Sequence, residues 1–131
     1  MDRIDKILNH DLFLYHLGRN NAAEADRRFC RHSMVHFLDV ARIGTIIALE
    51  EGFKIDREWI YAAALLHDCG KHEQYENGIP HEQASARIAP EILKTCGFDD
   101  EETGVIVTAI SRHRDPEVAK EKNLNGILYR A

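Results

Sequence analysis

The sequence predicts an all-α protein, a compact single-domain helical bundle of about five to seven helices. Apolar residues recur mostly at spacings of three and four along the chain, which is the period of an amphipathic helix. Alternating β-branched stretches are nearly absent, so strands are not expected. The length of 131 residues suits one domain with a single core, and no repeat or linker divides it, so residues 1–131 are expected to fold together.

Two helices are expected in the N-terminal part of the chain. The first covers roughly residues 2–17 and ends in the turn-like sequence "GRNN" at residues 18–21. The second runs from about residue 24 to residue 51, where Gly52 stops it. The apolar stripe of this second helix includes Phe29, Val35, Leu38, Val40, Ile43, Ile46 and Ile47.

A third helix is expected at the centre of the bundle. Asp56 suits the N-cap position before "REWIYAAALLHD", residues 57–68, and Gly70 ends the helix. The Ala-Ala-Ala-Leu-Leu run is apolar on every side, which is typical of a buried helix. The sequence "KHEQYENGIP", residues 71–80, then predicts a polar loop.

Three more helices complete the predicted bundle. Pro80 suits the first turn of a fourth helix that reaches about residue 96, and Pro90 is expected to kink or split it. The acidic run "DDEE" opens a fifth helix, about residues 99–112, where carboxylates interact favourably with the helix dipole. A last helix is expected over about residues 117–131.

Composition narrows the classes of function. The formal net charge of −5 does not favour a broad nucleic-acid-binding face, although a local basic pocket for a phosphorylated small molecule is compatible with it. No apolar stretch approaches the roughly 20 residues that cross a bilayer, so no membrane partner is expected. The N-terminus lacks the apolar segment of a signal peptide.

The cysteines indicate a reducing compartment. Cys30, Cys69 and Cys96 are widely spaced, odd in number and form no CxxC pair. This pattern argues against a disulfide framework. Together with the missing signal peptide, it predicts a cytoplasmic location.

Eight histidines are the one unusual count in the composition. His36 lies in the apolar part of the second predicted helix, His67 and Asp68 end the third, His81 begins the fourth and His113 ends the fifth. Neutral imidazole and carboxylate are ligands that borderline metals prefer. A bound divalent cation would explain how the polar pair at residues 67 and 68 is accommodated beside an apolar helix.

Four ordered sequence motifs resemble those of one known family. They are "HFLDVA" (36–41), "AALLHDCGK" (63–71), "PHEQASA" (80–86) and "VTAISRHR" (107–114). They resemble the successive motifs of the HD-domain superfamily of metal-dependent phosphohydrolases, and the resemblance covers about residues 24–131. The HD dipeptide alone is a weak signal, whereas the ordered set in an all-helical context is specific.

The resemblance implies a set of metal ligands. His36, His67 and Asp68 would hold one divalent ion, His81 and His113 would serve a second, and Asp68 would bridge the two. Iron, manganese, zinc, nickel, cobalt or magnesium could serve, since nitrogen and oxygen ligands do not select among them. His32 lies four residues before His36 and could face the same way. The family pattern favours His36, because a Val-Ala pair follows it at the expected distance.

The family closes its site with an aspartate in the last core helix, in a context like "ILYRAD". Here the sequence reads "GILYRA" up to Ala131, and the closing ligand is expected at the next position. Completion of the site by water, by Asp115 or by a partner chain is the alternative.

The function implied by the resemblance is phosphohydrolase activity on a phosphorylated small molecule, with a nucleotide favoured, by attack of a metal-activated water on phosphorus. Asp68 and Lys71 would be catalytic, and Lys71 resembles a lysine that lies near substrate in HDxGK variants. Arginine binds phosphate bidentately, so further phosphate-binding candidates are Arg27, Arg28 and Arg31 and, as weaker candidates, Arg112 and Arg114.

Two other functions stay open at this point. Some relatives of this fold use the same ligands to activate dioxygen, so a di-iron oxygenase is the first alternative. A non-catalytic regulator that binds metal or ligand is the second. A homo-oligomer is also left open.

Overall fold

The computed structural model describes residues 1–25 and 34–131, and all regular secondary structure in these ranges is helical. This confirms the all-α class. In chain order the elements are α1 (Asp2–Leu8), α2 (Asp11–Glu24), α3 (Met34–Glu51), α4 (Arg57–Leu66), α5 (Lys71–Asn77), α6 (His81–Thr95), α7 (Asp100–Ser111), the 3-10 helix η1 (Pro116–Val118) and α8 (Leu124–Arg130).

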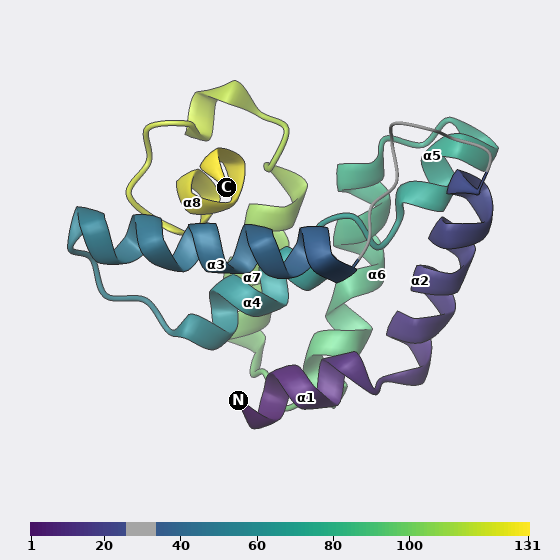
Figure 1. Cartoon of the computed structure of the whole chain (residues 1–131), viewed down its shortest axis with the longest axis horizontal. Coiled ribbons are helices and arrows are strands. Elements are labelled where there is room, and N and C mark those ends of the chain that lie inside the picture. The colour runs from purple at the N-terminus through teal and green to yellow at the C-terminus, as the bar shows by residue number, and fades with distance from the viewer. Residues whose placement is uncertain (26–33) are drawn as a thin grey trace.

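Helix α4 is the centre of the bundle, as expected. It packs against α1, α3, α6, α7 and α8, and α3 crosses in front of it in Figure 1. Its three consecutive alanines and the two leucines that follow are fully buried. Asp56 accepts a hydrogen bond from the Glu58 N–H at 2.9 Å, which confirms the predicted N-cap. The small side chains of α4 let its neighbours approach closely, which brings their ends toward the end of α4.

The N-terminal helix expected over residues 2–17 is two helices. The chain bends at His10, whose Nδ1 accepts a hydrogen bond from the Leu12 N–H at 3.1 Å and so begins α2. The sequence "GRNN" does not end a helix, and this prediction was wrong. Helix α2 continues to Glu24 because it packs on α5 and buries Asn20, which offsets the weak helix propensity of this stretch.

The buried face of α3 differs from the predicted stripe. Val40 is buried, but Val35, Ile43 and Ile46 are exposed, and Phe29 lies outside the described residues. The core side of α3 instead carries Phe37, Val40, Ala41, Gly44 and Ala48. Apolar residues occupy several sides of this helix, so spacing alone could not select the face. A Cβ at Gly44 would lie 2.9 Å from Ile60 Cγ2, which shows how closely α3 packs on α4.

The segment expected as a polar loop, residues 71–80, contains helix α5, so the loop prediction was wrong there. Helix α5 lies between α2 and α6 and buries His72. It ends at Gly78, whose φ of 71° is the left-handed conformation that glycine adopts without strain. Only one side chain of α5 is buried, so its sequence carries no clear apolar periodicity.

The next two helices follow the prediction closely. Pro80 is the N-cap of α6, and α6 continues through Pro90 without being split. Buried Ile88, Ala89 and Ile92 on either side of Pro90 hold this helix against the core. Asp99 and Glu102 form a capping box at the start of α7, as the acidic run suggested.

The C-terminal helix expected over residues 117–131 is a short 3-10 helix followed by α8. Asn123 begins α8 by accepting a hydrogen bond from the Gly126 N–H at 3.1 Å. A Cβ on Gly126 would lie only 1.8 Å from the Glu121 carbonyl oxygen, so glycine is required where the chain folds back. This turn places α8 against α3, α4 and α7. Of the helices described in residues 1–25 and 34–131, none has the length and apolarity that spanning a membrane requires.

Candidate metal centre

The HD dipeptide lies in the turn between α4 and α5. His67 is the C-cap of α4, and its backbone N–H still donates to the Ala63 carbonyl at 2.9 Å. The Lys71 N–H donates to the Asp68 carbonyl at 3.0 Å and closes the turn. Both side chains of the dipeptide are nearly buried, with His67 7% and Asp68 3% exposed. The end of the helix therefore directs two adjacent polar side chains into one site.

Gly70 does not end α4 as predicted, because α4 already ends at Leu66 with His67 as its C-cap; Gly70 is instead the N-cap of α5. A Cβ at this position would lie 2.6 Å from the Ser85 backbone nitrogen and 2.7 Å from Ala84 Cβ. The Gly70 N–H donates to Ser85 Oγ at 2.9 Å. Glycine thus lets the turn lie directly on α6, close to His81 at the start of that helix.

Asp68 is at the centre of a cluster of imidazoles. Its Oδ2 lies 3.1 Å from His67 Nε2, and its Oδ1 lies 3.3 Å from His81 Nε2 and 3.7 Å from His113 Nε2. His81 Nε2 and His113 Nε2 are 3.1 Å apart. The ligands predicted at the ends of α4, α6 and α7 are therefore brought together.

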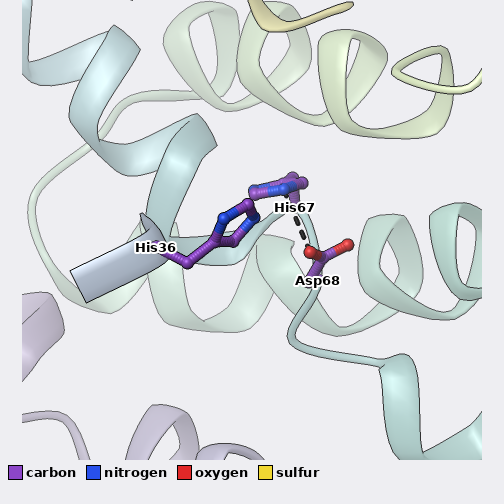
Figure 2. A group of neighbouring side chains, drawn as sticks. All are labelled: His36, His67 and Asp68. Carbon is purple, nitrogen blue, oxygen red and sulfur yellow. Dashed lines mark ion pairs between the residues drawn. The ribbon is translucent and has the colours of Figure 1, made fainter. Parts of the chain in front are cut away.

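His36 joins the cluster from α3. Figure 2 shows its ring directed toward His67 and Asp68. One ligand atom each from His36, His67 and Asp68 lies within 4.8 Å of the others, and the same holds for Asp68, His81 and His113. The two groups share Asp68, which is the arrangement that a bridging carboxylate between two ions requires. His32 lies outside the described residues.

The outer nitrogens of three histidines contact oxygen acceptors. His67 Nδ1 lies 2.6 Å from the Ala64 carbonyl, and His113 Nδ1 lies 2.6 Å from the Ile110 carbonyl. His81 Nδ1 lies 2.7 Å from Gln74 Oε1, which also accepts the His81 backbone N–H at 2.9 Å. Because these oxygens only accept, each Nδ1 carries a proton, and each Nε2 faces the cluster, where a neutral ring presents its lone pair.

The charge states favour a cation at this cluster. Burial, helped by the nearby His67, lowers the pKa of His113 to about 4, and burial also lowers the pKa of His81. Burial alone would lower the pKa of His67 and raise that of Asp68. Their mutual attraction outweighs burial, so the pKa of His67 is raised and the pKa of Asp68 is lowered. At neutral pH His81 and His113 are therefore neutral and Asp68 is ionised, the forms that bind metal. These converging nitrogen and oxygen lone pairs fit a divalent cation.

A pocket of about 260 Å³ opens onto the cluster. All five predicted ligands line it, together with Lys71, which is half-buried, and Arg114, which is exposed. Its wall is completed by Val40, Leu128, Tyr129 and Ala131. Ala131, after which the closing aspartate is expected, lines this pocket; that ligand stays a prediction. The pocket combines a metal-type ligand set with two cationic side chains.

The other predicted cationic candidates and Asp115 are not among the described residues of the site. Arg27, Arg28 and Arg31 fall outside the described residues. Arg112 pairs with Asp115 at 3.0 Å, and Asp115 also accepts a hydrogen bond from the Glu117 N–H at 3.0 Å, at the start of η1. Neither Arg112 nor Asp115 is among the residues described as lining the pocket. Of the two arginines beside His113, Arg114 is thus the one at the site.

Sequence reasoning missed Gln74 and Asn20, which support the ligands. Gln74 was assigned to the polar loop, whereas it lies on α5 and orients His81. Asn20 is 1% exposed, and its Nδ2 donates to the carbonyls of Asp68 and Cys69 at 3.0 and 3.3 Å. A single amide side chain carries no motif, and only the tertiary structure identifies its partners.

This fold and site define the class of the protein. The family model for the HD domain matches residues 34–131, and the chain belongs to this family. Membership places it in the superfamily of metal-dependent phosphohydrolases, whose HD domains bind divalent metals.

The chain is also similar to an uncharacterized protein of Clostridium beijerinckii (strain ATCC 51743 / NCIMB 8052). The two are 47% identical over 131 residues, which is all of this chain and 82% of that protein. No solved structure matches the chain.

Proposed function

We propose that the protein hydrolyses a phosphorylated small molecule, with a nucleotide as the favoured class, at the metal centre around Asp68. The observation that carries the proposal is one pocket in which an imidazole–carboxylate cluster adjoins two cations, Lys71 and Arg114. A metal ligand set alone suits many reactions. Cationic side chains beside it are suited to the negative charge of a phosphoryl group.

The residues of the site have separate roles in this proposal. His36, His67, Asp68, His81 and His113 would hold one or two divalent ions. When bound, such ions lower the pKa of a water molecule and offset the charge of phosphoryl oxygens. The Nδ1 contacts of His67, His81 and His113 keep their Nε2 atoms aimed at the cluster before substrate arrives.

Lys71 and Arg114 would bind the substrate. Both lie at the pocket that holds the ligands, so their charges can contact the phosphoryl oxygens directly. Tyr129 is half-buried in the same wall beside Leu128 and offers an aromatic surface for a base. This combination favours a nucleotide among phosphorylated small molecules.

The same ligands would also suit a di-iron oxygenase or a non-catalytic metal-binding regulator. Two cations at the pocket favour a phosphate substrate over dioxygen, which carries no charge to bind. Repeated turnover of a substrate would distinguish the hydrolase from a regulator, which binds its ligand without converting it.

The proposal is tested by phosphate release from a panel of nucleotides and phosphoesters in the presence of Mn²⁺ or Fe²⁺. We expect metal-dependent release from at least one compound, lost in His67→Ala. His10→Ala is the control, because His10 lies at the start of α2 and does not line the pocket. No release from any compound, or equal release by His67→Ala, would contradict the proposal.

A further inference from the structure

The turn that carries His67 and Asp68 is held from a helix outside the matched HD region. The family match covers residues 34–131, whereas Asn20 belongs to α2. Its Nδ2 donates to the Asp68 carbonyl at 3.0 Å and to the Cys69 carbonyl at 3.3 Å. Its Oδ1 accepts the backbone N–H of His72 at 2.8 Å. Both ends of this buried amide therefore bind one short stretch of backbone.

The contact with His72 completes the start of α5. The first N–H groups of a helix have no partner within it, and a side chain at the N-cap usually accepts one of them. Here the N-cap is Gly70, which has no side chain to do so. Asn20 supplies that acceptor from another helix. Its loss would leave the buried N–H of His72 without this acceptor. It would also remove one hydrogen-bond donor from each of the buried carbonyls of Asp68 and Cys69.

The turn is also held on its opposite side by α6, through the bond from the Gly70 N–H to Ser85 Oγ. The backbone at Asp68 thus lies between contacts from α2 and α6. Since Asp68 contacts His67, His81 and His113 together, a shift of its backbone would change the distances to all three. The position of the carboxylate depends on this backbone being fixed.

We infer that Asn20 is a positioning residue that sets the metal affinity of the HD site by fixing the turn at residues 68–72. The inference rests on the proposed metal-dependent function, because it concerns how tightly that site binds its ion. Polar groups that hydrogen-bond to metal-binding residues and orient them typically increase metal affinity. Their removal weakens metal binding by about 10- to 100-fold.

The test uses Mn²⁺ titrated into the full chain, with two variants at residue 20. Asn20→Ala removes the whole amide. Asn20→Asp keeps the size and the acceptor for His72 but replaces the donor with a carboxylate that faces two carbonyls. We expect each variant to bind Mn²⁺ at least about 10-fold more weakly than the wild type. Asn21→Ala is the control, because Asn21 is the exposed neighbour on the same helix, and it should bind within about twofold.

A second measurement separates positioning from general loss of stability. In metal-free protein, backbone amide exchange in Asn20→Ala should accelerate about 10-fold or more at residues 71–73, while amides of α7 keep the wild-type rates. Equal acceleration in all helices would overturn the inference, as would unchanged Mn²⁺ affinity in both variants. A wild type that binds no Mn²⁺ would instead overturn the proposed function, and the inference with it.

Discussion

In the proposed function, Lys71 is the residue whose charge most directly links the metal cluster to a phosphate substrate. It is half-buried at the pocket, three residues after Asp68. Hydrogen bonds to charged groups contribute about 1.5–3 kcal/mol, which corresponds to about 10- to 100-fold in rate. We predict that Lys71→Ala lowers kcat/KM by about this factor and leaves the bound metal unchanged.

The matched control for Lys71 is Lys94→Ala. Lys94 is an exposed lysine on α6 that pairs with Asp100 at 3.5 Å, and it does not line the pocket. Steady-state kinetics on a substrate from the panel and metal analysis of the same samples provide the measurement. Equal kcat/KM values for the Lys71 and Lys94 variants would show that Lys71 does not bind the substrate.

Gly70 gives a prediction about stability. A Cβ there would lie 2.6 Å from a backbone atom of α6, which cannot move away as a flexible side chain would. Gly70→Ala should therefore lower the free energy of unfolding of metal-free protein by about 1–3 kcal/mol, measured in urea.

Gly104 provides the control for that substitution. It is exposed on α7, and nothing lies within 4 Å of the Cβ that alanine would add. Gly104→Ala should raise stability by about 0.5–1 kcal/mol, since alanine has the higher helix propensity. If Gly70→Ala were as stable as Gly104→Ala, the close contact between the turn and α6 would be wrong.

At the scale of elements, the interface between α2 and α5 contains a histidine pair that responds to pH. His16 Nδ1 and His72 Nε2 are 2.9 Å apart. Burial, with His72 as the next cause, lowers the pKa of His16 from 6.5 to about 4. Between about pH 4 and pH 6.5, His16 is therefore more often protonated in the unfolded chain than in the folded one. The stability contributed by neutral His16 is therefore present above about pH 6.5 and is lost as the pH falls toward 4.

We predict that His16→Gln, which stays neutral, reduces the slope of unfolding free energy against pH over this range. Urea unfolding of metal-free protein at several pH values measures it. Above pH 7 the two curves should run parallel, because His16 is neutral in both states there. Parallel curves below pH 6 as well would contradict the pKa shift of His16.

The elements also show why some of the fold could be predicted and some could not. Helices α4 and α7 have clear sequence signals in an apolar run and an acidic run, and both were located from them. Helix α5 has one buried side chain, so its helical state depends on α2 and α6 and not on periodicity. The same limit applies to α3, where apolar residues on several sides hid which face is buried.

At the scale of the whole molecule, the grouping of the candidate ligands could be predicted because they lie in short sequence motifs, three of them at helix ends. His67 and Asp68 are adjacent, and His81 and His113 each mark the end of a helix. The residues that hold these ligands could not be predicted. Asn20 is 48 positions from Asp68, and Gln74 lies in a segment expected to be a loop. Packing of α2 on α5, of α5 on α6, and of α6 on α4 and α7 brings both kinds of residue together.

One or two divalent ions are expected to bind at Asp68 with the four histidines around it. Anomalous X-ray scattering from crystals grown with Mn²⁺ tests this binding most directly, because it locates the ion without reference to activity. We predict one or two peaks, in contact with Asp68 and with His36, His67, His81 or His113. An absence of peaks in this pocket, or a peak whose ligands do not include Asp68, would show that this cluster is not the metal site.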